Sequence, residues 1–355
     1  MPGGLEVSDL RPMATPDALA GIRVLELASV LAGPLAGTDL AARGATVTKV
    51  ERPPHGDVTR SWRTAQEPPV TDLDGRPTSA YWAAANAGKQ IAWIDLATPE
   101  GLAWLEEALA SHDVVLQNFK EADLAKFNLT PSALSSRHPH LVHVRLIGFR
   151  GQPERLAYDV VVQAETGWMH MNGNPPTRMP VALMDVLASH AIREAVLEGL
   201  FTRERHPQGR GSYHEISLAD CGVAALANQA TNHLLGGLSP GSSGNEHPNI
   251  APYGDLLPCR DGFVVLAVGS DRQFSGLCQV LNLPDLPNDN RFRHNTDRLA
   301  HRKELVSELQ LAAAHWRKVD LELALRAAGV PAGVVRTIPE VFSSGFQFSH
   351  GAQTT

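Results

Sequence analysis

The 355-residue sequence lacks several features that would assign a functional class directly. It has three cysteines, Cys221, Cys259 and Cys278, which are too few and too widely spaced for a disulfide framework or a zinc knuckle. Its formal net charge of −7 excludes the basic surface of a nucleic-acid-binding protein, although a few local cations would still suffice for a phosphorylated small molecule. No uninterrupted apolar run approaches the length of a membrane span. The N-terminus, MPGGLEVSDLRPMATPDALAG, has neither the basic start nor the apolar segment of a secretory signal. We therefore expect a cytoplasmic protein without nucleic-acid or membrane partners.

Two common catalytic fingerprints are also not indicated. The G-x-S-x-G match GLSPG (237–241) lies in the Gly/Ser/Pro-rich linker, so no serine-hydrolase elbow is expected. The turn LASVLAGPLAG (27–37) lacks the G-x-G-x-x-G pattern of dinucleotide-binding loops and has Pro34 where a glycine is needed, which disfavours a nicotinamide dehydrogenase. Glu51 nevertheless ends the next predicted strand, and the flanking Lys49 and Arg52 would suit a ribose that carries a phosphate. An ordinary strand-to-helix turn and a phosphorylated-nucleotide site both remain open on these residues.

Strand and helix patterns alternate through the first half of the chain. Strands are predicted at 22–27, 46–51, 91–96, 113–119 and 140–149. Between them lie helical patterns, one of which opens with Thr98 as a cap and Pro99 at the first helical position. This alternation favours an α/β fold with a large, doubly wound, Rossmann-like domain and a mostly parallel sheet. Ligands of such sheets bind beyond the carboxyl ends of the strands. The loops at those ends are 29–34, 51–60, 117–120 and 148–159.

The sequence of the second half of the chain predicts longer helices and a smaller α/β domain. Helices are expected over 187–204 and, as a nearly apolar and therefore buried element, over 217–236. A hairpin turning at Asp261-Gly262 and helices near 271–281, 301–316 and 319–328 follow. The expected domains are a flexible extension (1–20), the large domain (21–235), a Gly/Ser/Pro-rich linker (236–249), the small domain (250–335) and a tail (336–355).

Two groups of polar residues invite a chemical interpretation. His138, His140 and His143 lie close together, but no neighbouring carboxylate or cysteine completes a ligand set, so solvated turn histidines are favoured and no metal is expected. Asp185 lies in MPVALMDVLASH (179–190), at the expected start of a helix. It is either an N-cap, which is the commoner role of such an aspartate, or a nucleophile held at the positive end of the helix.

Seven segments in a fixed order suggest a family. They are GIRVLELASVLAGPLAGTDLAARGATVTKVERPPHGDVTR (21–60), IDLATPEG (94–101), DVVLQNFK (113–120), AYDVVVQAETG (157–167), PVALMDV (180–186), QGRGSYHEISLAD (208–220) and GNEHPNIAPYG (244–254). Together they resemble the family III CoA-transferases of the CaiB/BaiF type, the group of formyl-CoA transferase and carnitine CoA-transferase. The resemblance runs from about residue 20 to residue 342.

The resemblance implies a role for Asp185, because the nucleophilic aspartate of the family lies in the segment matched by PVALMDV. In family members this carboxylate attacks an acyl-CoA thioester and forms a mixed anhydride. The CoA thiolate then gives an aspartyl-CoA thioester, and an acceptor acid takes the CoA through a second anhydride. The implied ligands are therefore CoA and acyl-CoA, as substrates and not as a tightly bound cofactor, together with a small carboxylic acid.

The resemblance also implies CoA contacts. The matching positions are Leu31, Ala32, Arg52, Ile94, Asp95, Leu96, Asn118, Phe119, Lys120, Lys126, Ala157, Tyr158 and Asp159. Arg52 and Lys126 would donate charge-assisted hydrogen bonds to phosphates, and Phe119 would form an apolar wall for the thioester arm. The family often has lysine at position 97, where this chain has Ala97, so one phosphate contact is missing.

The resemblance leaves two alternatives. The α-methylacyl-CoA racemases of the same superfamily use a histidine at the position of Tyr158, and a neutral phenol is a poor base near neutral pH. Family chains usually continue for several tens of residues beyond the point matched by Thr355 and close each subunit into a ring, two of which interlock as a homodimer. A shortened tail would make the ring incomplete, which suggests a catalytically impaired CoA-ester-binding protein as a further alternative to the transferase.

Overall fold

The computed structural model describes residues 17–152, 154–242 and 244–343. Most of the expected N-terminal extension and residues 344–355 of the expected tail lie outside these residues. The chain divides into two compact units. Among the described residues, the first unit contains those up to His170 and Thr177–Pro240, and the second contains Met171–Pro176 and those from Gly241 onward.

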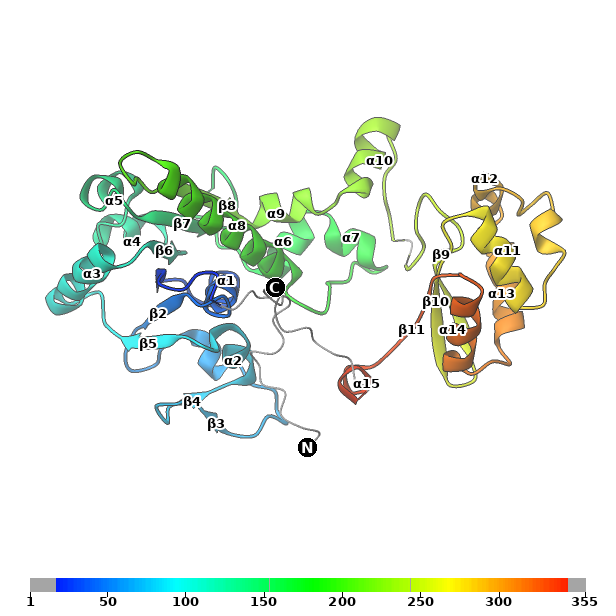
Figure 1. Ribbon diagram of the computed structural model, residues 1–355, viewed down its shortest axis with the longest axis horizontal. Helices are drawn as coiled ribbons and strands as arrows, with labels where there is room; N and C mark the ends of the chain where they lie inside the picture. The colour runs from blue at the N-terminus through cyan, green and yellow to red at the C-terminus, as the bar shows by residue number, and fades with distance from the viewer. Residues whose placement is uncertain (1–16, 153, 243, 344–355) are drawn as a thin grey trace. The chain divides into compact units, whose positions relative to one another are not determined.

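The first unit is built on a six-stranded parallel sheet (Figure 1). Its strands are β1 (Arg23–Glu26), β2 (Thr46–Glu51), β5 (Gln90–Trp93), β6 (Val114–Gln117), β7 (Val142–Ile147) and β8 (Tyr213–Ser217). Their spatial order is β5-β2-β1-β6-β7-β8, and every neighbouring pair is parallel. The chain order reverses between β1 and β6, so the loops after these two strands diverge and leave a crevice at their carboxyl ends.

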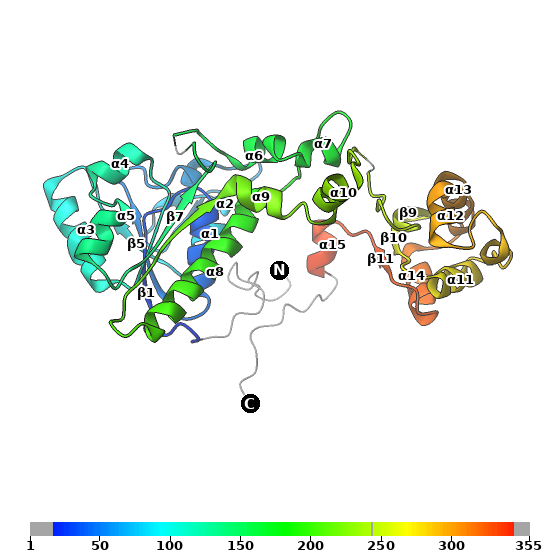
Figure 2. The same ribbon diagram turned by 90° about the horizontal axis from the view of Figure 1, so that it is seen from above.

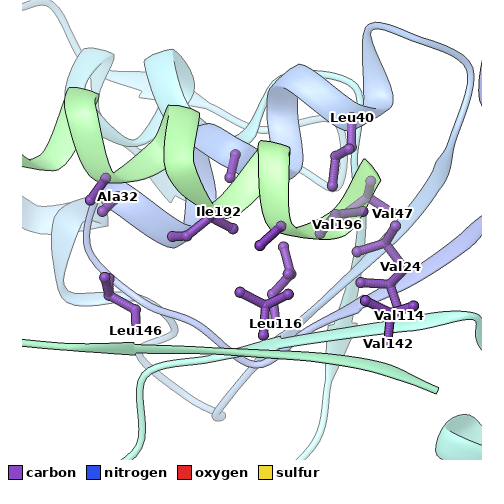
Figure 3. Close-up of a cluster of buried hydrophobic side chains, with 14 of the residues drawn as sticks. Val24, Ala32, Leu40, Val47, Val114, Leu116, Val142, Leu146, Ile192 and Val196 are labelled. Atoms are coloured by element: carbon purple, nitrogen blue, oxygen red, sulfur yellow. The ribbon is translucent and has the colours of Figure 1, made fainter. Parts of the chain in front are cut away.

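Helices cover both faces of this sheet because alternate strand residues point to opposite sides. Val24, Val114 and Val142 pack with α1 (Ala32–Ala41) and α8 (Leu183–Arg205), the core drawn in Figure 3. Leu25 and Val115 belong to the core on the other face. The helices of that face are α3 (Pro99–Ser111), α4 (Glu121–Lys126) and α5 (Pro131–Arg137), and Figure 2 shows them across the sheet from α1 and α8. The prediction of a doubly wound α/β fold is confirmed.

Glycines bring α1 close to the end of β1. A Cβ on Gly33 would overlap the side chain of Ala28, and a Cβ on Gly37 would overlap the carboxylate of Glu26. Glu26 is fully buried and pairs with Lys89 at 2.7 Å and with Lys49 at 3.1 Å. The bare face of α1 therefore leaves room for a buried ion network under the helix.

The region expected to be one buried helix, 217–236, differs from the prediction. It forms α9 (Leu218–Ala224) and α10 (Asn228–Gly236), separated at Ala227, which has φ = +47°. No side chain of α10 is buried, and Leu235 is 85% exposed. The prediction was wrong because apolar composition alone does not show that other residues of this chain pack against a helix and bury it.

The remaining elements of the first unit connect or flank these layers. They are the 3₁₀ turn η2 (Val58–Ser61), β3 (Val70–Thr71), β4 (Pro77–Thr78), α2 (Ala80–Asn86), α6 (Asp159–Glu165) and α7 (Trp168–Asn172), the last of which runs into the second unit. As predicted, the hydroxyl of Thr98 caps α3 by accepting the N–H of Gly101.

The second unit contains an antiparallel sheet packed with helices. Its strands are β9 (Tyr253–Cys259), β10 (Gly262–Ala267) and β11 (Ala332–Val334), in the order β11-β10-β9. Its helical elements are α11 (Asp271–Val280), η3 (Leu286–Asn288), α12 (Asn295–Ala300), α13 (Arg302–Ala313), α14 (Lys318–Ala327) and α15 (Ile338–Ser343). The expected hairpin is present, but its turn residues are Arg260 and Asp261, one position earlier than predicted, because Gly262 already pairs with Cys259. Among the helices that the structure describes, none has the combination of length and apolar character that crossing a bilayer requires.

The close approach of α1 to Glu26 makes a stability prediction. Gly37→Ala should lower the free energy of unfolding by about 1–3 kcal/mol, because the new methyl group displaces a buried, paired carboxylate. Gly236→Ala is the matched control, since a Cβ there meets nothing nearer than 3.6 Å and alanine favours the helix. Urea unfolding of both variants measures the difference. Equal stabilities of the two variants would contradict the packing argument.

Candidate active site

Two adjoining cavities lie at the carboxyl ends of β1 and β6. The smaller has a volume of about 150 Å³ and the larger about 440 Å³. They share a wall formed by Ser29, Asn118, Phe119 and Lys120, which belong to the loops that leave these two strands. The site therefore lies at the topological switch point, where open parallel sheets bind ligands.

The structure brings nearly all of the predicted site residues to these cavities. The larger cavity is lined by Arg52, Ile94, Asp95, Leu96 and Lys126, and by Ala97. The smaller is lined by Leu31, Ala32, Ala157, Tyr158 and Asp185. Asn118, Phe119 and Lys120 face both. Asp159 is buried and lines neither cavity.

Three cations, Arg52, Lys120 and Lys126, line the larger cavity together with the carboxylates of Asp95 and Asp123. Arg52 is largely exposed and lies 3.2 Å from Asp95, while Lys120 and Lys126 form no ion pair with any residue that the structure describes. Exposed pairs such as Arg52–Asp95 contribute little to stability, so Arg52 can exchange its partner for a ligand phosphate at small cost. Three cations therefore remain for an anionic group at this cavity.

Asp185 is the third residue of α8, and it is not the cap of that helix. The capping position is Ala182, whose side chain forms no capping hydrogen bond. The N–H of Met184 instead donates to Oδ1 of Asp159 at 2.7 Å, and Oδ2 of Asp159 accepts from Nε2 of Gln163 at 2.6 Å. Asp159, at the start of α6, thus caps α8 from outside. The N-cap interpretation of Asp185 is wrong, since another carboxylate already accepts from the start of the helix.

The carboxylate of Asp185 is left without a protein partner. No hydrogen bond or ion pair joins it to the described part of the chain. Burial raises the pKa of Asp185 to about 7, and the negative charge of Asp159 contributes in the same direction. Both oxygens of Asp185 are therefore available for bonding, and a large share of the side chain is ionised at neutral pH.

The first turn of α1 forms another wall of the smaller cavity. Leu31 precedes the helix and Ala32 begins it, and their N–H groups have no acceptor among the residues described here. N–H groups at a helix start carry partial positive charge. They are suited to an oxygen on which negative charge develops beside Asp185.

Tyr81 belongs to the surroundings of Asp185, and the sequence analysis missed it. This residue lies on α2 and its ring contacts Trp62 edge-on, with centroids 5.2 Å apart. Burial raises the pKa of Tyr81, and the charges of Asp185, Asp159 and Asp57 raise it further. The phenol therefore stays protonated and can donate a hydrogen bond. No local sequence pattern indicates that Tyr81 lies near Asp185.

The three histidines contribute no metal site. His138 and His143 are buried, and burial lowers the pKa of His143 to about 4, so the expectation of solvated turn histidines was wrong. His143 lies inside β7, within the strand predicted over 140–149, and its ring reaches Gln117. Within the described ranges, no three histidine, cysteine, aspartate or glutamate side chains gather as a metal site would require.

Comparisons with known proteins identify the family. Residues 19–352 match the sequence family described as CoA-transferase family III. The succinate–glutarate CoA-transferase of Agrobacterium fabrum is 40% identical over 92% of this chain and 82% of its own length. The succinyl-CoA:glutarate CoA-transferase of Mus musculus is 32% identical over 98% of this chain and 80% of its own.

A solved structure shares the fold. A CAIB/BAIF family protein from Brucella suis superimposes with a TM-score of 0.80 and 37% sequence identity, covering 93% of this chain and 86% of that one. The resemblance inferred from the seven segments is therefore confirmed. The chain belongs to CoA-transferase family III, the enzymes that move CoA between an acyl-CoA thioester and a carboxylate.

Proposed function

We propose that this enzyme transfers CoA between two small dicarboxylic acids, with Asp185 as the nucleophile. The observation that carries the proposal is the carboxylate of Asp185, unpartnered and partly buried in the smaller cavity. A carboxylate is a weak nucleophile when water surrounds it. Burial removes part of that hydration, and the start of α8 keeps the anion stable enough to form.

The reaction consists of four exchanges at the Asp185 carboxyl group. An oxygen of Asp185 attacks the thioester carbonyl and the C–S bond breaks. The CoA thiolate departs, and an acyl–aspartyl anhydride remains. The thiolate then attacks the aspartyl carbonyl, so that the first acid departs and an aspartyl-CoA thioester forms. The acceptor carboxylate displaces the thiolate and gives a second anhydride. The thiolate finally attacks the acceptor's carbonyl, which releases the new acyl-CoA and regenerates Asp185.

Each exchange passes through a tetrahedral intermediate with a negatively charged oxygen. We assign its stabilisation to the N–H groups of Leu31 and Ala32, which have no acceptor within the described chain and line the cavity of Asp185. Tyr81 is a further candidate donor, because its phenol stays protonated.

The larger cavity is proposed to bind the nucleotide part of CoA. Arg52 and Lys126 would meet its phosphates, and Lys120 stands where the two cavities join. Phe119 forms part of the shared wall, where the pantetheine arm would pass towards Asp185. Asp159, by contrast, would act on CoA only indirectly, because both of its oxygens already accept protein hydrogen bonds.

The dicarboxylic substrate class rests on two observations. The relatives from Agrobacterium fabrum and mouse carry the names of succinate and glutarate transferases. In this chain, Arg155 lines the cavity of Asp185, where it stacks on Phe149 at 3.9 Å and pairs with Glu165 at 2.6 Å. A cation fixed in this way offers a counter-charge for the second carboxylate of a short acid. The cavity's small volume favours acids of few carbons.

The racemase alternative is not favoured, because the matching relatives are named CoA-transferases and Tyr158 stands where a racemase has its base. The transfer assay with succinyl-CoA and glutarate distinguishes the proposed transferase from a CoA-ester-binding protein without catalysis. The interlocked homodimer and the cytoplasmic location stay predictions.

Mixing the enzyme with succinyl-CoA and glutarate should yield glutaryl-CoA and free succinate, detected by liquid chromatography and mass spectrometry. Asp185→Asn should lower the rate about a thousandfold or more, because the amide cannot form the anhydride. Glu194→Gln, which changes an exposed carboxylate on the same helix, should leave the rate unchanged. Binding of succinyl-CoA without transfer to any acid would contradict the proposal, as would α-proton exchange with deuterated water when no acceptor is present.

The pH dependence should report the ionisation of Asp185. Since only the carboxylate attacks, kcat/KM should fall about tenfold per pH unit below the pKa of Asp185, which lies at about 7, and level off above it. Asp159→Asn removes a neighbouring negative charge, so this limb should move to lower pH by roughly half a unit or more. Asp220→Asn, an exposed change on α9, should leave the limb in place. An unshifted limb in Asp159→Asn would refute the proposed coupling.

A further inference from the structure

The turn before α1 contains a strained residue. Val30 has φ = +73°, in the left-handed region that β-branched residues avoid. Its side chain lines the smaller cavity, immediately before Leu31 and Ala32. Such a conformation persists only when surrounding contacts enforce it.

Side chains from three other elements hold the backbone of this turn. The carbonyl of Ala28 accepts from Nζ of Lys49 at 2.8 Å. Asn118 forms two hydrogen bonds of 3.1 Å with Ser29. Its Oδ1 accepts from the Ser29 N–H, and its Nδ2 donates to the Ser29 carbonyl. The N–H of Val30 donates to Oδ2 of Asp57 at 3.2 Å. Three consecutive residues are thus fixed by side chains distant in sequence.

Asp57 is itself rigidly held. Its side chain is 1% exposed, and Oδ2 lies 3.1 Å from Nζ of Lys49. Oδ1 of Asp57 accepts hydrogen bonds from the N–H and the hydroxyl of Thr59, at 3.0 and 2.8 Å. The backbone N–H of Asp57 donates to Glu51 at 3.0 Å. Although burial alone would raise the pKa of Asp57, Lys49 and Thr59 outweigh it and hold that pKa below its usual value.

We propose that Asp57 is a positioning residue that holds Val30 in its left-handed conformation and thereby fixes the wall of the Asp185 cavity. The inference rests on the proposed function of that cavity. Asp57 touches no reacting atom in this scheme. It acts through the Val30 N–H on Leu31 and Ala32, which line the cavity of Asp185 and to which we assign oxyanion stabilisation.

The test combines a loss with a rescue. Asp57→Ala should lower kcat by about tenfold or more and change the KM for acyl-CoA less than about threefold, because the turn relaxes while CoA still binds. Adding Val30→Gly should restore about a third or more of the lost rate, since glycine adopts a positive φ without strain. Asp57→Asn keeps the size of the side chain and serves if the alanine variant does not fold. Its loss should be relieved by Val30→Gly in the same way.

Thr59→Val is the matched control. It removes one hydrogen bond to the same carboxylate while leaving the contact with Val30, so kcat should stay within about twofold of the wild type. A structural role without positioning would make the control resemble Asp57→Ala and would leave the double variant no better than the single one. Either result would overturn the proposal.

Hydrogen–deuterium exchange of the peptide covering residues 28–32 provides a readout that needs no activity. The Val30 amide should exchange faster in Asp57→Ala and as slowly as in the wild type in Thr59→Val. Unchanged exchange in Asp57→Ala would overturn the positioning inference even if CoA transfer is observed. Altered exchange in an enzyme that transfers no CoA would instead reject the proposed function alone.

Discussion

The hydrogen bond from the N–H of Met184 to Asp159 is the interaction on which the candidate site depends. It satisfies the start of α8 from a neighbouring helix, so Asp185, one residue further on, does not have to. The result is two carboxylates with opposite roles. Asp159 is buried and fully hydrogen-bonded, whereas Asp185 is partly buried and unpartnered. Burial of Asp185 raises its pKa to about 7 with Asp159 adding to the effect, and its oxygens face a cavity. Had Asp185 capped its own helix, its oxygens would be occupied and unreactive.

The turn before α1, which lines the same cavity, contains groups that lower stability. The left-handed Val30 and the buried charges of Glu26, Lys49 and Asp57 are each unfavourable in isolation. They support one another, since Lys49 pairs with both carboxylates and also holds the turn through the carbonyl of Ala28. The two apolar cores of the doubly wound sheet offset these costs and keep the loops after β1 and β6 in fixed positions. The two cores on the sheet thus stabilise the fold, while the strained backbone of Val30 lies at the carboxyl end of β1.

The sequence predicted the features that depend on local pattern. Alternating strands and helices indicated the doubly wound sheet. The Thr98 cap and the presence of a hairpin near Asp261 followed from residue type, although the turn lies one residue earlier than predicted. Nearly all of the site residues predicted from the family resemblance line one pair of cavities. What the sequence could not supply were contacts between distant elements. Nothing local shows that Asp159 caps α8, that Asp57 reaches Val30, or that Tyr81 lies near Asp185. The exposed α10 and the buried His143 were misjudged for the same reason, because burial is set by neighbours that periodicity does not name.

The most direct measurement is to trap the covalent enzyme during turnover. The wild-type enzyme would be mixed with succinyl-CoA, quenched with hydroxylamine and digested, and the peptide that contains Asp185 analysed by tandem mass spectrometry. An anhydride or thioester on this side chain would be converted to a hydroxamate, so the account predicts that modification at Asp185, and only when acyl-CoA is present. CoA transfer with Asp185 unmodified, or with the hydroxamate on a different carboxylate, would contradict the central claim.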